Sequence, residues 1–223
     1  MTIEEVYQLA IKSGMETDPR GESSVKKLLT KRKKEYQELS KEKKVDFDLE
    51  SLQNPYSDSR ILFGDPKKKI KKIFAGIDIG SAEVVLADRL NQKSEAIDLI
   101  LGHHPHGVAL AGLYEVIDIQ IDILAQCGVP VNIAEGLLKE RIAEIKRKIY
   151  PVNHSRSVDA ARLLGFLFWC VHTPADNLVF QFLSKLLEKE KPETVGEVVT
   201  ILKRIPEYQK AASEKAGPTI AVG

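Results

Sequence analysis

The sequence predicts a three-layer α/β fold in which helices cover both faces of a mixed sheet. From Gly64 onward, strand-like segments alternate with helical ones, and this alternation is typical of the α/β class. Two short apolar runs, 97–101 and 166–171, have the length and composition of buried strands. The 223 residues are 43% hydrophobic and 29% charged, so the chain can bury the core of a soluble domain.

Residues 1–53 are predicted to form a charged helical appendage, and residues 54–223 the main domain. Apolar residues recur at helical spacing within a run of lysines, and Asn54-Pro55 ends the pattern. Acidic residues are interleaved with these lysines, which indicates a solvated helix face rather than a surface for phosphate groups. The formal net charge is +1, so nucleic acid is not expected as a partner. The helical stripe consists of Val25, Leu28, Leu29, Tyr36 and Leu39.

The central elements begin with a turn at 64–66 and a strand over 70–79. Ser81 is then predicted to cap a helix over 82–90. The segment 110–126 shows both strand-like alternation and a helical stripe, and its length favours a helix. A cap pair of Asn132 and Glu135 predicts another helix, which ends near Pro151. Further helices, interpreted as scaffold, are predicted over 178–187, over 195–204 and up to Lys215.

The histidines of this chain indicate metal chemistry. All five lie between His103 and His172, and three of them fall in the hexapeptide 102–107. The two apolar runs end directly before His103 and His172, and Asp176 follows four residues after His172. Ligands of open α/β sheets bind at the ends of strands. Two strand ends therefore carry candidate metal ligands.

The adjacent side chains of His103 and His104 are expected to point to opposite sides. Pro105 disfavours the helical conformation for His104, so the pair should be extended. Neighbouring side chains of an extended chain diverge. Two ions bridged by a carboxylate such as Asp176 would use both imidazoles, whereas one ion would reach both only through a backbone kink. The sequence therefore predicts a dinuclear site.

Other interpretations of these residues stay open. Asp176 also fits the first turn of a helix that Thr173 caps and Pro174 begins. A carboxylate at that position stabilises a helix without binding a metal. His103 and His104 could likewise form a polar junction between a strand and a loop.

A second polar cluster precedes a short helix that ends at Gly165. There His154 and Arg156 could hold a phosphate or carboxylate group of a substrate, because helix starts attract anions, and Asp159 would orient one of them. The alternative is a helix capped by Ser155, with Arg156 paired to a nearby acid.

Together these motifs resemble a known family, the NGG-interacting-factor-three-like proteins, also labelled GTP cyclohydrolase type-two homologues. The resemblance rests on GHHPHG at 102–107, HTPAD at 172–176, the turn at 61–66 and the strand at 72–78, and it covers residues from Asn54 to the C-terminus. It implies that His103, His104 and Asp176 bind two metal ions. It also implies a purine or pterin-like substrate and a ring-like homohexamer.

The sequence departs from the family pattern at three places. His106 stands where the family usually has an apolar residue, and residues 56–60 replace a tryptophan-aspartate-asparagine stretch. The late histidine and glutamate that close the family's site are not found in these 223 residues. Because residues 219–223 resemble the opening of a strand, the chain is expected to be the N-terminal portion of a longer protein.

The residues and the resemblance together predict a metal-dependent hydrolase that acts on a small molecule. Two divalent ions, of zinc, iron or manganese, would lower the pKa of a water molecule, and His106 or His172 would move the proton. The alternative is a non-catalytic metal-binding protein or an oligomeric interaction scaffold. Cys127 and Cys170 lack a metal-type spacing and are expected to be packing residues. A cytoplasmic protein is expected, because neither a signal peptide nor a membrane-spanning run is visible.

Overall fold

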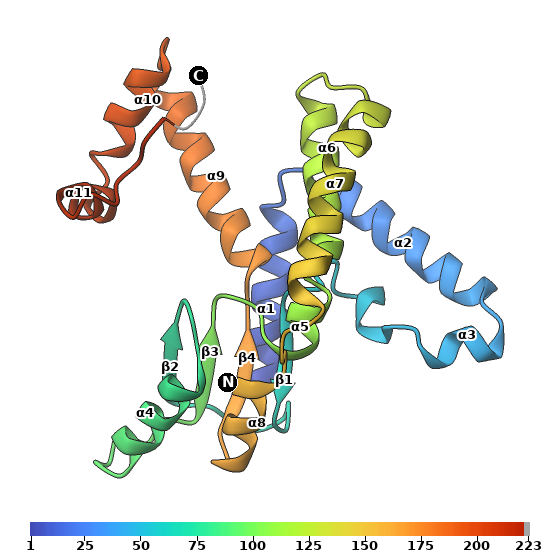
Figure 1. Cartoon of the computed structure of the whole chain (residues 1–223), viewed down its shortest axis with the longest axis vertical. Coiled ribbons are helices and arrows are strands. Elements are labelled where there is room, and N and C mark those ends of the chain that lie inside the picture. The colour runs from blue at the N-terminus through green and yellow to red at the C-terminus, as the bar shows by residue number, and fades with distance from the viewer. Residues whose placement is uncertain (221–223) are drawn as a thin grey trace. The chain divides into compact units, whose positions relative to one another are not determined.

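The structure, a computed structural model, describes residues 1–220 and confirms the α/β class. Its sheet has the strand order β1-β4-β3-β2, with β2, β3 and β4 parallel and β1 antiparallel to β4. Helices pack on both faces of this mixed sheet (Figure 1). The strands are β1 (Arg60–Phe63), β2 (Ile73–Gly76), β3 (Leu99–Gly102) and β4 (Leu167–Cys170).

The chain divides into two compact units, Met1–Leu178 and Val179–Gly223, and the sheet belongs to the first. The helices of the first unit are α1 (Ile3–Glu16), α2 (Glu22–Glu38), α3 (Lys41–Val45), η1 (Leu49–Leu52), α4 (Ser81–Asn91), α5 (Gly107–Ala111), η2 (Leu113–Ile117), α6 (Asp118–Gln126), α7 (Val131–Ile149) and α8 (Arg156–Leu163). The long helix α9 (Thr173–Glu190) begins in the first unit and continues into the second, which also contains α10 (Val195–Leu202) and α11 (Pro206–Ser213).

Alternating side chains of the central strands build a core on each face of the sheet. On one face, Ile100 and Phe168 pack with buried residues of α4 and α8. On the other face, Leu99 and Trp169 pack with α1. Successive strand residues point to opposite faces, and both faces of β3 and β4 are buried. Every position of these strands is therefore apolar, and their sequences are continuous hydrophobic runs. This is why the runs 97–101 and 166–171 could be recognised as buried strands.

The N-terminal helix α1 belongs to this core, which corrects the expectation that residues 1–53 are an appendage. Ile3, Tyr7 and Ile11 are at most 5% exposed. Tyr7 meets the ring of Trp169 edge-on, with ring centroids 5.8 Å apart. Their four-residue spacing places all three side chains on one face of the helix. The charged surface predicted for the following residues is found in α2 and α3, whose described residues include only Val25 as a buried position.

Three predicted elements have different bounds in the structure. The strand expected over 70–79 is reduced to β2: before it the Ile70 amide donates to the Met1 carbonyl, and after it the chain bends at residues 77 and 78. The helix expected over 82–90 already includes Ser81, and its N-cap is Gly80, whose amide donates to Glu83 Oε2 at 2.7 Å. The helix expected over 110–126 is divided into α5, η2 and α6, with a break at Gly112.

Helix α7 begins one residue before the predicted cap pair. Its N-cap position is Pro130, and no side chain makes a capping hydrogen bond there. The pair formed by Asn132 and Glu135 therefore lies inside the helix and does not start it. The end of the helix, with Tyr150 at the C-cap, agrees with the stop predicted near Pro151.

In the second unit, α10 and α11 correspond to the helices predicted over 195–204 and up to Lys215. Of the strand predicted at 219–223, residues 219 and 220 belong to no strand, and residues 221–223 lie outside the described residues. Within residues 1–220, no helix combines the length and the apolar character needed to cross a membrane.

Candidate metal centre

One end of the sheet collects polar residues from all four strands. Asp78 follows β2, His103 and His104 follow β3, and His172 follows β4. These three strands are parallel, so their carboxyl ends share one edge. β1 runs the opposite way and begins where β4 ends, since Arg60 pairs with Cys170. The residue just before β1, Asp58, therefore reaches the same place.

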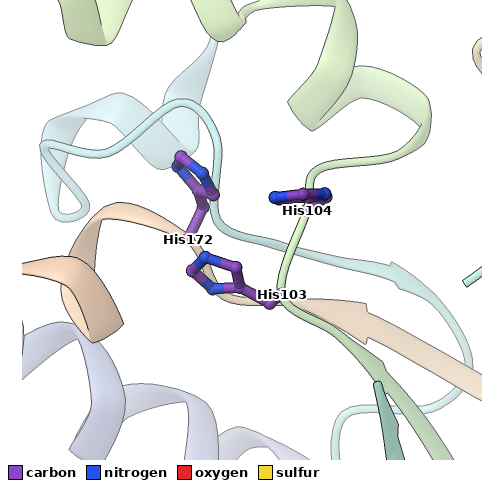
Figure 2. Close-up of side chains that lie close together, drawn as sticks. All are labelled: His103, His104 and His172. Carbon is purple, nitrogen blue, oxygen red and sulfur yellow. The ribbon is translucent and has the colours of Figure 1, made fainter. Parts of the chain in front are cut away.

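The rings of His103, His104 and His172 converge at this edge (Figure 2). One ligand nitrogen from each ring lies within 4.8 Å of the others. The ring centroid of His103 is 5.2 Å from that of His104 and 4.7 Å from that of His172. Imidazole nitrogens are common ligands of transition metals, so this cluster is a candidate metal centre.

The expected divergence of His103 and His104 is wrong. The amides of both residues donate to carbonyls at the end of β2, His103 to Gly76 and His104 to Ile77, each at 2.9 Å. Consecutive amides of an extended strand point in opposite directions, so two that donate to the same side show that the backbone bends here. The bend is the kink that the sequence analysis judged necessary for both rings to approach one region.

Each of the three rings uses its Nδ1 atom for a contact behind the cluster. His103 Nδ1 is 3.2 Å from the Val171 carbonyl oxygen, and His104 Nδ1 is 2.6 Å from Asp78 Oδ1. His172 Nδ1 is 3.0 Å from Asp58 Oδ2. Nδ1 is therefore the protonated donor in each neutral ring, and Nε2 carries the free lone pair. Metal-binding histidines in proteins are usually held in this way.

Asp58 is the buried anchor of the centre, and the sequence analysis did not identify it. Its side chain is inaccessible to solvent. Besides the His172 ring, it accepts hydrogen bonds from the Thr173 hydroxyl at 2.5 Å and from the Thr173 amide at 3.3 Å. The Thr173 hydroxyl, predicted to cap α9, is therefore engaged with Asp58 instead. The Ser59 hydroxyl also donates to Asp58, at 3.1 Å, and accepts from the His172 amide at 2.9 Å.

Asp78 was likewise missed as a site residue, although a signal was present. It follows a strand, as His103 and His172 do, but the predicted strand extended past it to residue 79 and so hid the strand end. Its carboxylate contacts the His104 ring, and its side chain is 84% exposed.

The carboxylate charge at the centre favours the protonated form of His172. Burial by itself lowers the pKa of this imidazole. The hydrogen bond and charge of Asp58, with the charge of Asp176, outweigh burial, so the pKa lies above its ordinary value. In the absence of metal, a proton therefore competes well for the ring. Metal binding must displace that proton.

Asp176 lies in the first turn of α9 and also beside the histidines. Its Oδ1 atom is 3.5 Å from His103 Nε2, and its Oδ2 atom is 3.8 Å from His172 Nδ1. Its amide donates to the His172 carbonyl at 3.1 Å. The two interpretations of this residue are thus compatible, because the start of the helix is what carries the carboxylate to the cluster.

His106 lies outside the three-imidazole cluster. Its ring packs against Phe168, with centroids 5.4 Å apart, on the face of the sheet that α4 and α8 cover. Its Nε2 atom is buried and has no hydrogen-bond partner among the described residues. Burial lowers the pKa of this imidazole and outweighs the nearby Asp78 carboxylate, which acts in the opposite direction. The ring is therefore neutral near pH 7.

His154 and Arg156 occupy the start of α8. The Nε2 atom of His154 is 2.9 Å from the Ile149 carbonyl oxygen, so the ring joins this loop to the end of α7. The His154 carbonyl accepts from the Gly107 amide at 2.8 Å, which connects the loop to the segment after the histidine motif. Arg156 is exposed and forms no ion pair within residues 1–220. Asp159 pairs with Arg162 at 2.9 Å, so it orients neither His154 nor Arg156.

Neither cysteine takes part in the centre. Cys170 is buried in β4, and burial raises the pKa of its thiol to about 11, so it stays protonated. Cys127 is exposed at the end of α6. The expected packing role is met by Cys170 only.

The fold and the site define a class of protein, an α/β protein with a histidine cluster at the carboxyl ends of parallel strands. The structure is similar to the crystal structure of a NIF3 superfamily protein from Sphaerobacter thermophilus, with a TM-score of 0.59 and 25% sequence identity. The match covers 70% of this chain and 56% of that chain, so this chain corresponds to little more than half of that protein. No family model and no curated protein matches the sequence. The structural match agrees with the resemblance to the NIF3-like family that the motifs indicate.

Proposed function

We propose that this chain binds divalent transition-metal ions at His103, His104 and His172 and acts as a metal-dependent hydrolase on a small molecule. The observation that carries the proposal is the geometry of the three rings. They converge with Nε2 free, and a carbonyl or a carboxylate holds each Nδ1 from behind. A merely polar junction between strand and loop would not need three supported imidazoles.

The spacing of the donors fits two ions that share the Asp176 carboxylate. Donors about 2.1 Å from a single tetrahedral ion stand about 3.4 Å apart, whereas the ring nitrogens here spread over up to 4.8 Å. A pair of ions about 3.5–4 Å apart accepts the wider spacing. The Asp176 carboxylate lies beside two of the rings, 3.5 Å from His103 Nε2 and 3.8 Å from His172 Nδ1, so it is near enough to share in binding. Zinc, iron and manganese are all compatible with histidine and carboxylate ligands.

The chain's own residues then have distinct roles. Bound ions would supply Lewis acidity and lower the pKa of a water molecule. Asp58 fixes the orientation of the His172 ring, and Asp78 that of His104. His106 is a neutral imidazole that can accept a proton. His154 and Arg156 would hold an anionic group of the substrate, for which a purine or pterin nucleotide is the proposed class.

Metal content of site variants tests the centre. We expect the loss of either ring in His103→Ala or His104→Ala, and of the charge in Asp176→Asn, to lower the molar ratio of metal to protein, which elemental analysis measures. A bridging Asp176 lowers the occupancy of both ions. Asp88→Asn, at a half-buried position on α4 whose carboxylate accepts a hydrogen bond from Gln92, is the control. Unchanged ratios in all three variants would refute the dinuclear proposal.

Turnover separates a catalyst from a non-catalytic metal-binding or scaffold protein. Metal-loaded protein is assayed with nucleotides, pterins and small phosphoesters. A hydrolase loses its turnover when a chelator is added and when Arg156→Ala or His154→Ala is introduced. Arg162→Ala is the matched control, because Arg162 lies on the same helix and pairs with Asp159. A scaffold would show no turnover at all. Self-association into the family's hexamer, proposed for either function, is measured by sedimentation.

A further inference from the structure

The loop before β1, residues 54–60, is closed by hydrogen bonds between its own buried residues. Asn54 accepts a hydrogen bond from the Tyr56 amide and donates one to the Ser59 carbonyl, each at 2.8 Å. Arg60 donates to the same Ser59 carbonyl at 2.9 Å and also to the Tyr56 carbonyl. These four residues are at most 4% exposed. Buried polar groups that are satisfied in this way hold a segment in a single conformation.

Side chains of α1 and of the η1 region hold this loop in place. The Tyr7 hydroxyl, on α1, accepts a hydrogen bond from Asn54 at 2.7 Å. The Arg60 guanidinium pairs with Asp48 at 2.8 Å and with Glu50 at 3.4 Å. Arg60 is buried, and a buried charge is retained only where such partners balance it. The conformation of the loop therefore depends on contacts with both helices.

Ser59 connects the loop to the metal centre through a single hydroxyl group. The hydroxyl accepts a hydrogen bond from the His172 amide at 2.9 Å and donates one to Asp58 Oδ1 at 3.1 Å. Both its donor and its acceptor function are thus used. The other oxygen of Asp58 contacts the His172 ring at Nδ1. Ser59 therefore fixes the backbone of His172, whereas Asp58 fixes the ring.

We infer that Ser59 is a positioning residue of the metal centre. A histidine held both at its backbone and at its ring presents Nε2 in one orientation, here toward the rings of His103 and His104 (Figure 2). Because this orientation exists before an ion arrives, binding does not have to order the ligand. The loop 54–60 supplies the rigid support, since its buried hydrogen bonds fix the Ser59 backbone. The inference rests on the proposed binding of metal by His172.

Titration of Ser59 variants with Co²⁺ tests the inference. Ser59→Ala removes the hydroxyl but keeps every proposed ligand and Asp58. We expect Co²⁺ to bind this variant about tenfold more weakly, as measured by competition with a chromophoric chelator. The visible absorption of the bound Co²⁺ should also change, because it reports the coordination geometry. Ser59→Thr keeps a hydroxyl at this position and should recover most of the affinity and the original spectrum.

Two further variants separate positioning from folding. Ile97→Val removes one buried methylene on the sheet face that α4 covers, before the amino end of β3, and lowers stability by an amount similar to the loss of one hydrogen bond. It should leave the affinity and the Co²⁺ spectrum unchanged. Tyr7→Phe keeps the ring and removes only the hydroxyl that contacts Asn54. It is the milder variant and should weaken binding in the same direction as Ser59→Ala, but less. Circular dichroism establishes that each variant is folded.

Several results would overturn the inference. If Ser59→Ala bound Co²⁺ with the affinity and spectrum of Ile97→Val, the role of Ser59 would be wrong while the proposed metal binding stood. Equal weakening by Ser59→Ala and Ser59→Thr would show that the hydroxyl is not responsible. If Ser59→Ala did not fold, unchanged binding by Tyr7→Phe would overturn the inference instead. Failure of the unmodified chain to bind Co²⁺ would overturn the proposed function and this inference with it.

Discussion

The position of the His172 ring depends on a buried carboxylate far away in the sequence. Asp58 and His172 meet because β1 runs antiparallel to β4 and begins where β4 ends. The types and spacing of His103, His104 and Asp176 made these residues recognisable from the sequence. Asp58 could not be recognised in the same way, since its role depends on a long-range strand pairing that local patterns do not encode.

Replacement of Asp58 by asparagine should weaken metal binding about 10- to 100-fold. Asparagine preserves the size of the side chain but removes its charge, and it presents an amide group where one carboxylate oxygen accepts hydrogen bonds. The His172 ring then loses its fixed orientation. A competition titration against a chromophoric chelator measures the affinity.

The control for this experiment is Asp88→Asn, which removes a carboxylate that contacts only the exposed Gln92 side chain. It should leave the affinity unchanged. If Asp58→Asn bound metal as tightly as the unmodified chain, the role of Asp58 in positioning His172 would be wrong.

At the scale of elements, the contact between α1 and α9 is unusually close within the first unit. A Cβ atom built on Gly14 would lie 2.6 Å from Pro174 Cβ and 2.7 Å from Pro174 Cα. The Asn177 side chain also donates to the Gly14 carbonyl at 3.0 Å. Glycine at this position therefore allows the start of α9, which carries Asp176, to approach α1.

Gly14→Ala should destabilise the chain even though alanine is the better helix former. Helix propensity favours alanine by about 1 kcal/mol, but overpacking against backbone atoms costs about 1–3 kcal/mol. We expect the steric cost to prevail and the melting temperature to fall by a few degrees, about 2–4 °C for each kcal/mol. Thermal unfolding followed by circular dichroism measures the change.

Gly136→Ala is the same substitution at another helix position, and we expect it to stabilise the chain. A Cβ atom at this position in α7 meets nothing within 4 Å. The helix should therefore gain about 0.5–1 kcal/mol. A melting temperature that changed in the same direction for both variants would contradict the close approach of α1 and α9.

Helices and strands were predicted where one pattern dominated, and bounds were misjudged where tertiary contacts decided them. The buried strands were recognisable because both of their faces are apolar. The division of 110–126 at Gly112 was not, since the stripe of apolar residues continues across the break. The core position of α1 was overlooked because exposed residues such as Glu4, Glu5 and Gln8 separate the buried positions of this helix.

At the scale of the whole molecule, a buried ion pair joins the end of α1 to the segment before β1. Arg20 donates to both oxygens of Asp18, each time at 2.9 Å. The Tyr56 hydroxyl donates to Asp18 Oδ2 at 2.8 Å. Burial by itself raises the pKa of Asp18, but the contacts with Arg20 and Tyr56 outweigh it, so the pKa lies below its ordinary value.

The lowered pKa of Asp18 predicts sensitivity to acid. A carboxyl group whose pKa is lower in the folded state contributes stability above its ordinary pKa, about 3.9. That contribution decreases as the pH falls through the folded-state pKa. We therefore expect the free energy of unfolding to decrease below about pH 4. Urea unfolding over a series of pH values measures it.

Asp18→Asn should remove this part of the pH dependence. The variant should be less stable at neutral pH by about 3–5 kcal/mol, because it leaves the buried Arg20 without its main partner. Its stability should change less between neutral and acid pH than that of the unmodified chain. If both proteins lost the same amount of unfolding free energy at acid pH, other carboxylates would be responsible for the sensitivity.

The α/β class and the resemblance to the NIF3-like family were recognisable from the sequence, whereas the division into units was not. The family motifs lie at strand ends, and the structure keeps them together there. The predicted boundary after residue 53 followed a change in charge pattern. Charge reports exposure to solvent, whereas compact units are defined by packing, which joins α1 to the sheet and divides the chain at Leu178 instead.

The collection of site residues from all four strands has a consequence for how metal and stability are linked. In an unfolded chain the proposed donors are far apart, so an ion that binds them would prefer the folded state and stabilise it in proportion to RT ln(1 + [metal]/Kd). Retention of the metal depends in turn on the stability of the fold. β1 lies at one end of the strand order, and each local opening of this strand would withdraw Asp58 from His172. The residence time of a bound ion would then depend on local unfolding of β1 as well as on the strength of the coordination bonds.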